Sequence, residues 1–269
     1  MDGLTSDLDS EIGRRLSKLV NQPQLVRWIL EEVSSSFSQQ NQEPAALEMA
    51  RRFNDGEPIQ YIFGHWSFRS LELKCDTRAL IPRPETEQLV DLVLDSLKAL
   101  QGRRVLEIGT GTGAIAISLA VEVPGLDIVA TDISTEALAL ATENLDRFAT
   151  QSTVKFVLSD LFESLDKELK FDLIVSNPPY VPSSSEIPPV VRDYEPHVAL
   201  FGGPQGLNII LPIICQAQNW LSGSGARVLL EIDESHGSAV VEAAEVAGYS
   251  GFEIFQDLAG KDRFARLTY

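Results

Sequence analysis

The stretch VLEIGTGTG, residues 105–113, decides the fold that we predict for this chain. It is typical of a buried strand that runs into a glycine-rich turn and then into a helix. Glycines permit positive φ and close approach of the backbone to a ligand, and the free N–H groups at a helix start present partial positive charge. Ligands of open parallel sheets lie beyond the carboxyl ends of the strands. We therefore expect this turn to face a cofactor site.

Strands and helices alternate strictly from residue 103 onward, after a helix predicted at residues 86–100. The predicted strands span residues 104–108, 127–133, 153–159, 171–176, 226–232, 252–256 and 263–268, and the helices between them span 113–123, 134–148, 206–221 and 238–247. Most of these strands are continuous apolar runs, as in strands buried on both faces. The alternation predicts an α/β fold with a doubly wound, seven-stranded, Rossmann-like sheet, whose last two strands form an antiparallel hairpin at the edge.

The N-terminal part is predicted to be a separate helical domain. Apolar side chains recur at helical spacing over residues 12–20 and 25–33, and Pro44 marks the start of a third helix that ends near residue 53. The apolar residues between 59 and 73 alternate, which predicts a β-hairpin. We divide the chain into a helical domain at residues 1–55, a β-hairpin linker at 56–80 and a cofactor-binding domain at 81–269.

Composition excludes several classes of protein. The chain carries 22 basic and 39 acidic side chains, a net charge of -17, which disfavours a nucleic-acid-binding protein because it repels a polyanion. Cys75 and Cys215 show no metal-ligand spacing, so we expect neither a metal nor a disulfide. No apolar run is long enough to span a bilayer, and the acidic N-terminus lacks the basic flank of a secretory signal. A cytoplasmic protein without membrane association is expected.

Two carboxylates near the glycine-rich turn indicate which cofactor the site binds. Asp132 ends the next strand, where a carboxylate accepts the hydroxyls of a ribose. Glu107 precedes the first glycine by two residues, and a buried carboxylate there would repel a diphosphate but tolerate a cation. The glycine spacing alone also fits a loose dinucleotide fingerprint. Glu107 favours S-adenosylmethionine, whose sulfonium and ammonium groups are positive.

The third strand of the sheet ends in a turn on the same rim. There Asp160 is placed to accept from an adenine amino group, and Leu161 and Phe162 to pack on the ring. A surface turn with two core residues is the alternative interpretation.

The tetrapeptide Asn177-Pro178-Pro179-Tyr180 follows the fourth strand and is the sharpest chemical signal. The nitrogen of an amide or aromatic amine is a poor nucleophile because its lone pair is delocalised. The Asn177 side-chain oxygen and the Pro178 carbonyl can each accept one N–H of such a group, and Tyr180 can supply a flat face beside it. The two prolines stiffen the loop. The motif predicts catalysis by positioning, without a metal or a strong base.

These motifs, together with GEPIQYIFG at residues 56–64 and LIPRPETE at 80–87, resemble the release factor glutamine methyltransferases, the HemK or PrmC family. The resemblance covers nearly the whole chain. It implies a class I methyltransferase fold and methyl transfer from S-adenosylmethionine to the N5 amide nitrogen of the glutamine in the Gly-Gly-Gln motif of class 1 release factors. It also implies that the helical domain grips the release factor.

The site residues that we predict fall into three groups. The catalytic residues are Asn177, Pro178 and Tyr180. The cofactor-binding residues are Glu107, Gly109, Thr110, Gly111, Thr112, Gly113, Asp132, Asp160, Leu161 and Asn177. The substrate-binding residues are Asn177, Pro178, Pro179, Tyr180 and Arg83. Family members often carry an aromatic residue where Leu161 stands.

Three other functions compete with this interpretation. An adenine-N6 methyltransferase of DNA or RNA would use the same tetrapeptide on a flipped base, but the chain lacks a basic stripe. A binding module without catalysis would not need an intact Asn177–Tyr180 loop. A nucleotide-dependent oxidoreductase is disfavoured by Glu107. We expect a monomer that binds class 1 release factors and no nucleic acid stably.

Overall fold

A computed structural model describes residues 10–269, and residues 1–9 of the predicted helical domain lie outside the described part. The chain divides into two compact units. The first comprises the described residues up to Gly64 together with Pro188–Tyr194, and the second comprises His65–Ile187 and Glu195–Tyr269. The chain therefore passes from one unit to the other three times.

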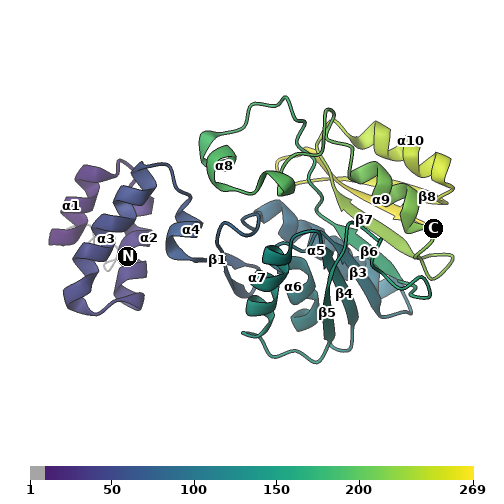
Figure 1. The fold of residues 1–269 in the computed structure, drawn as a ribbon, viewed down its shortest axis with the longest axis horizontal. Helices are drawn as coiled ribbons and strands as arrows, with labels where there is room; N and C mark the ends of the chain where they lie inside the picture. Colours follow the sequence, from purple (N-terminus) through teal and green to yellow (C-terminus); the bar gives the residue numbers. More distant parts are fainter. Residues whose placement is uncertain (1–9) are drawn as a thin grey trace. The chain divides into compact units, whose positions relative to one another are not determined.

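The first unit is helical (Figure 1). Its elements are α1 (Glu11–Leu19), α2 (Pro23–Ser36), α3 (Gln39–Asn54), α4 (Ile59–Phe63) and α8 (Pro189–Tyr194). The Ser10 side chain caps α1 by accepting from the Gly13 N–H at 3.0 Å. In α2, Ile29 and Val33 recur at helical spacing and are buried. The Tyr194 hydroxyl donates to the Asp55 carbonyl at 3.2 Å, which ties α8 to the end of α3.

Residues 59–63 form a helix, so the alternation that predicted a strand there was misleading. The Pro58 carbonyl accepts from the N–H groups of Tyr61 and Ile62, and Gly64 ends the helix at φ +77°. Buried positions in so short a segment fit either a strand or one helical turn, and the left-handed glycine decides between them. The hairpin itself is present but shorter than predicted, with β1 (His65–Phe68) antiparallel to β2 (Leu71–Lys74).

Two further helices differ from their predicted bounds. α3 begins at Gln39, so Pro44 lies inside the helix rather than at its start. α9 (Ile210–Ala217) is shorter than the predicted 206–221, because Gly206 at φ +76° belongs to a turn that precedes it. The helix α8 and the 3-10 helix η1 (His197–Ala199) were not predicted.

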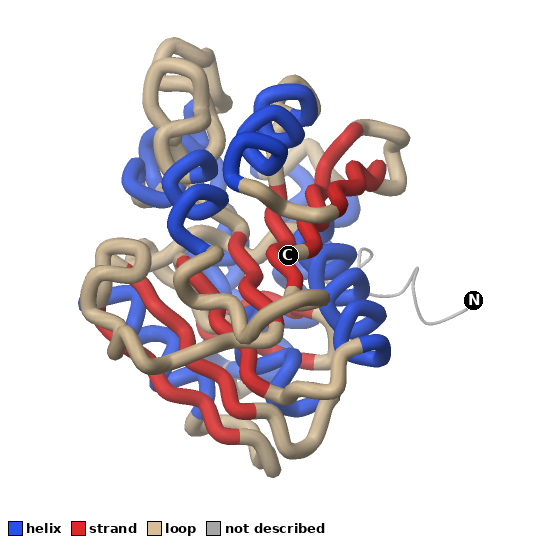
Figure 2. Tube along the Cα trace, turned by 90° about the vertical axis from the view of Figure 1, so that its right-hand side faces the viewer, coloured by secondary structure: helices blue, strands red, loops and turns tan. Residues whose placement is uncertain are grey.

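The second unit is built on a seven-stranded sheet, whose strands run side by side in Figures 1 and 2. The strand order is β5-β4-β3-β6-β7-β9-β8. The strands are β3 (Arg104–Ile108), β4 (Asp127–Asp132), β5 (Thr153–Leu158), β6 (Leu173–Ser176), β7 (Arg227–Glu231), β8 (Gly251–Gln256) and β9 (Asp262–Thr268). The remaining helices are α5 (Pro84–Ala99), α6 (Ala114–Glu122), α7 (Thr135–Leu145) and α10 (Gly237–Ala247). β3 to β7 pair in parallel, and β9 pairs antiparallel with β7 and β8. The predicted doubly wound sheet with an antiparallel edge hairpin is confirmed.

Side chains that alternate along each strand enter two separate cores. Val105 of β3 packs in a cluster with residues of α5 and α6. Leu106, its neighbour in sequence, packs with residues of α9 on the opposite face. Both side chains are fully buried. Because helices cover both faces, polar groups are left to the ends of the strands, where the connecting loops lie.

Candidate active site

A pocket lies at the carboxyl ends of β3, β4 and β6. The chain moves outward from β3 to β4 and β5, then returns to place β6 on the other side of β3. Such a reversal of strand order opens a crevice in which parallel α/β sheets bind ligands. Twelve of the predicted site residues line the pocket: Arg83, Glu107, Gly109, Thr110, Gly111, Thr112, Asp132, Asp160, Leu161, Asn177, Pro178 and Pro179. Gly113 and Tyr180 do not line it.

The glycine-rich turn is held against the neighbouring strand by its backbone. The N–H groups of Gly109 and Thr110 both donate to the Thr131 carbonyl of β4, at 2.8 and 2.9 Å. Gly113 caps α6 at φ +83°, and a Cβ there would lie 2.8 Å from the Ile117 Cδ1 atom and 3.2 Å from the Ala141 Cβ atom. Gly113 therefore serves the packing of α6 against α7 rather than contact with the pocket.

Glu107 lies at the floor of the pocket with 1% of its surface exposed. Its Oε2 atom accepts from the Thr110 hydroxyl at 2.8 Å and from the Ala116 N–H at 3.1 Å. Burial raises the pKa of Glu107 to about 8, against the opposing effect of these two hydrogen bonds. A cation placed in the pocket would therefore stabilise the ionised form of this buried carboxyl group.

Asp132 joins β4 to the glycine-rich turn. Its Oδ2 atom accepts from the Gly111 N–H and its Oδ1 atom from the Ser134 N–H, both at 2.9 Å. Burial raises the pKa of Asp132, and the backbone hydrogen bonds oppose that change. Each oxygen of a carboxylate has a second lone pair, so the group can still accept from a ligand's hydroxyls.

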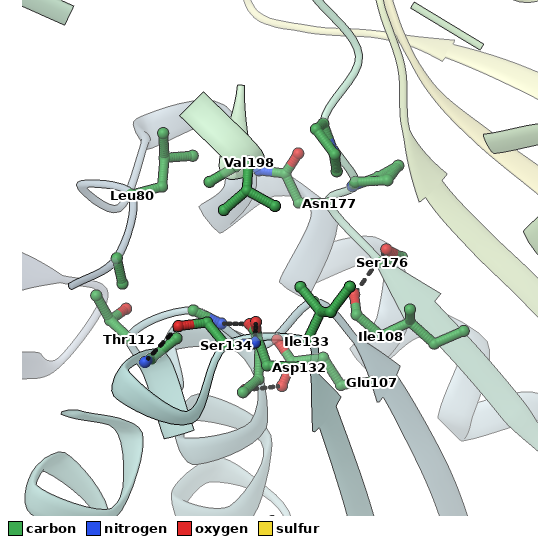
Figure 3. A pocket seen from close by; sticks show the side chains of 18 of the residues that line it. Leu80, Glu107, Ile108, Thr112, Asp132, Ile133, Ser134, Ser176, Asn177 and Val198 are labelled. Atoms are coloured by element: carbon green, nitrogen blue, oxygen red, sulfur yellow. Dashed lines mark hydrogen bonds between the residues drawn. The ribbon is translucent and has the colours of Figure 1, made fainter. Parts of the chain in front are cut away.

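Apolar side chains form the walls of the pocket. Leu161 lines it from a left-handed backbone position at φ +46°. Phe162 does not, because its side chain is 2% exposed and stacks on Trp220 with ring centroids 5.8 Å apart. Sequence reasoning missed Ile133 and Val198, which are 55% and 58% exposed and line the pocket. Figure 3 shows Val198 and Asn177 across the pocket from Ile133 and Asp132.

Ile133 follows Asp132 directly, and this position next to a strand-end carboxylate is the sequence feature that could have predicted its contact with the pocket. Val198 belongs to η1, far away in sequence, and carried no signal.

Hydrogen bonds to side chains of α5 and β7 hold the tetrapeptide after β6 in place. The Asn177 Nδ2 group donates to the Thr86 hydroxyl at 2.9 Å, and that hydroxyl donates to the Glu231 Oε2 atom at 2.8 Å. The Tyr180 hydroxyl donates to the Glu231 Oε1 atom at 3.1 Å. Burial raises the pKa of Glu231 to about 7, while these donors act in the opposite direction. Sequence reasoning did not single out Glu231.

The following loop closes tightly over this tetrapeptide. The Val181 N–H donates to the Leu200 carbonyl, and the Gly202 N–H donates back to the Val181 carbonyl, both at 2.9 Å. A Cβ on Gly202 would lie 2.4 Å from the Pro179 carbonyl oxygen. Residues 200–202 therefore support the loop through backbone contacts that exclude a side chain.

Arg83 lies at the pocket edge, where its guanidinium pairs with Glu195. The Glu195 carboxylate is 4% exposed and also accepts from the Ile81 N–H at 3.1 Å. This pair anchors the Ile81–Pro84 segment to the chain that follows α8.

Comparison with known proteins decides the family. The Methyltransferase small domain family model matches residues 86–193. A release factor glutamine methyltransferase of Rhodopirellula baltica is 35% identical over 245 residues, covering 88% of this chain and 83% of that protein. One of Lactococcus lactis is 44% identical over 224 residues, covering 80% and 79%. The chain belongs to the release factor glutamine methyltransferase family.

Membership in this family confirms the predicted resemblance, and solved structures confirm the fold. A 16S rRNA methyltransferase from T. thermophilus, solved with S-adenosylmethionine and guanosine, superposes with a TM-score of 0.55 at 18% identity. The match covers 76% of this chain and 49% of the rRNA enzyme. Because the sequence identity is low, it supports the class I methyltransferase fold alone.

Within residues 10–269 of this family member, no group of three or more His, Cys, Asp or Glu side chains is arranged to hold a metal ion. None of the described helices is long and apolar enough to cross a membrane.

Proposed function

We propose that this protein transfers a methyl group from S-adenosylmethionine to the N5 amide nitrogen of the glutamine in the Gly-Gly-Gln motif of class 1 release factors. The observation that carries the proposal is the position of Asn177 and Pro178 beside the glycine-rich turn, in one pocket. Family membership supports the glutamine substrate and the release factor as its carrier.

The residues of the pocket fit S-adenosylmethionine. Asp132 would accept the ribose hydroxyls, and Leu161 and Ile133 would cover the adenine, with Asp160 beside its amino group. Glu107 and the glycine-rich turn would hold the methionine end, where a cation compensates the buried carboxyl group. The cofactor supplies a methyl group on a positively charged sulfur, which is a good leaving group.

The chain's own contribution is to orient the acceptor amide. The Asn177 Oδ1 atom and the Pro178 carbonyl oxygen would each accept one N–H of the glutamine side chain. Pro178 and Pro179 limit the motion of that carbonyl, because each proline fixes its own φ. The reaction would need no base to create the nucleophile, since the amide proton would pass to water only as the new C–N bond forms and the methyl–sulfur bond breaks to leave a neutral thioether. Catalysis then arises from fixed geometry and fixed acceptors.

The assignments of the domains and of the partners rest on the same proposal. The helical unit would grip the release factor, whereas the second unit would hold the cofactor and the glutamine. We also propose that the protein acts as a cytoplasmic monomer without stable binding to nucleic acid or membranes, which the net charge of -17 supports for nucleic acid. That charge disfavours the adenine-N6 alternative, although the tetrapeptide would serve it equally well.

The test is mass spectrometry of a class 1 release factor incubated with the protein and S-adenosylmethionine. We expect the glutamine of the Gly-Gly-Gln motif to gain the mass of one methylene group. Asn177→Ala should abolish the gain, and Asn219→Ala, a change at an exposed residue of the second unit outside the pocket, should not. An unmodified release factor alongside methylated adenine in DNA or RNA would establish the alternative instead.

A further inference from the structure

Two buried groups form a hydrogen-bonded line behind the proposed catalytic amide of Asn177. Glu231 ends β7 and is fully buried, Thr86 lies in the first turn of α5 with 5% of its surface exposed, and Asn177 follows β6. The hydrogen bonds between them measure 2.8 Å from Thr86 to Glu231 and 2.9 Å from Asn177 to Thr86. None of the catalytic or binding roles proposed above explains this line of contacts.

The donors and acceptors that each group carries set the direction of these hydrogen bonds. An ionised carboxylate only accepts, so the single hydroxyl proton of Thr86 goes to Glu231. The Thr86 oxygen can then only accept from Asn177, and the group that Asn177 turns toward it must be the NH2. The amide oxygen of Asn177 consequently faces away from Thr86.

We propose that Glu231 and Thr86 are positioning residues that fix the orientation of the Asn177 side-chain amide, so that its oxygen and not its nitrogen meets the substrate. This inference rests on the proposed function, because it concerns how Asn177 receives the glutamine NH2. A flipped Asn177 would present N–H to N–H, and the substrate would lose one of its two acceptors. An asparagine alone carries no preference between these two orientations, since its oxygen and nitrogen have nearly the same size.

Other groups around Glu231 strengthen the arrangement. The Tyr180 hydroxyl donates to its Oε1 atom at 3.1 Å, so both carboxylate oxygens receive a donor. Arg263 of β9 attracts the ionised form, and Glu85 of α5 repels it. Burial outweighs these effects and raises the pKa of Glu231 to about 7. Below that pH the carboxyl group gains a proton and can donate to Thr86, which removes the constraint on Asn177.

The test compares Thr86→Val with Thr86→Ser. Valine has the shape of threonine without the hydroxyl, and serine keeps the hydroxyl. With saturating S-adenosylmethionine and a class 1 release factor as substrate, we expect Thr86→Val to lower kcat about 10- to 100-fold, the effect of one lost buried hydrogen bond in the transition state. Thr86→Ser should remain within about threefold of the wild type, and all three proteins should bind S-adenosylmethionine equally. The wild-type and serine proteins should lose kcat as the pH falls through about 7, and the valine variant should not show that change.

A second measurement decides the proposal without activity. The Asn177 side-chain amide is observed by nitrogen–proton NMR and assigned by its disappearance in Asn177→Ala. One of its protons should exchange slowly with solvent in the wild type and in Thr86→Ser, and rapidly in Thr86→Val. Equal exchange in all three proteins, or equal kcat in the valine and serine variants, would overturn the proposal. If the wild type does not methylate a release factor, the proposed function fails, and the exchange rates still decide the orientation of Asn177.

Discussion

Replacing Gly206 by alanine should displace the catalytic loop without touching the pocket. Gly206 lies at φ +76°, and a Cβ placed there would be 2.0 Å from the Tyr180 carbonyl oxygen. It would also be 2.8 Å from the His236 Cε1 atom, so the new methyl group cannot simply move aside. Because real Cβ contacts stay above 3.0 Å, the Tyr180 carbonyl must move by about 1 Å. The stiff prolines that precede Tyr180 would transmit this movement to the Pro178 carbonyl.

Gly206→Ala should have two effects of different size, one on stability and one on the reaction rate. A non-glycine residue in the left-handed region costs about 1–2 kcal/mol of stability. A displacement of about 1 Å in a group that positions the substrate costs about 100-fold in rate. The first effect lowers the melting temperature, and the second lowers kcat of the folded enzyme.

Gly260→Ala is the matched control. Gly260 has nearly the same φ, +78°, and nothing lies within 4 Å of a Cβ built on it. Both variants should therefore lose similar stability from the backbone, and Gly206→Ala should lose more because of its clash. Only Gly206→Ala should lower kcat, measured by mass spectrometry of release factor methylation at a temperature where both variants are folded. A Gly206→Ala enzyme with the kcat of Gly260→Ala would refute the argument that this glycine positions the loop.

Three further predictions concern buried charge. As pH rises from 6 towards 8, the ionised fraction of Glu107 grows, and affinity for S-adenosylmethionine should rise by up to about tenfold per pH unit. Calorimetry should find weaker binding and a flatter pH profile in Glu107→Gln, and a flat wild-type profile would contradict this prediction. Because the pKa of Glu107 in the folded protein, about 8, exceeds its ordinary value of 4.5, its contribution to stability is complete below pH 4.5 and lost as pH rises through 8. Urea unfolding without cofactor should follow this slope, and Glu107→Gln should reduce it. Arg83→Ala leaves the Glu195 carboxylate buried without its cation and should destabilise the fold by about 1–3 kcal/mol in the same assay, whereas a change below about 0.5 kcal/mol would show that the pair contributes little.

The sequence predicted the parts of the fold that depend on pattern. Alternating apolar strands and helices after residue 103 were sufficient for the order of the sheet strands, because the central strands β3, β4, β6 and β7 are buried on both faces and their composition shows it. The short helix α4 was missed because five residues do not distinguish the two periods, and Pro44 misled because it lies inside α3. Such errors arise where one residue, here Gly64 at φ +77°, settles a local conformation.

The site was predictable where its residues follow a strand directly. Asp132 and Asn177 come at the ends of β4 and β6, so a parallel sheet brings them to one rim. Glu231 occupies the same kind of position on β7, but nothing in its own stretch indicates that Thr86, 145 positions earlier, would meet it. Val198 likewise reaches the pocket from η1, which is distant in sequence from the other lining residues. Such contacts depend on tertiary packing, which a reading of single segments does not contain.

The polarity of the pocket accounts for which groups it can accept. Glu107 and Asp132 present carboxylate oxygens, and Pro178 presents a carbonyl. If Asn177 presents its oxygen as well, the two groups that meet the substrate amide, Asn177 and Pro178, are both acceptors. A glutamine NH2 supplies the two donors that these oxygens need, and a sulfonium supplies the positive charge. A glutamate in the same place would bring a carboxylate and no donor, leaving the Asn177 and Pro178 oxygens buried without partners. The protein would therefore discriminate glutamine from glutamate by the penalty of unpaired acceptors, a form of selectivity that does not require a pocket of different size.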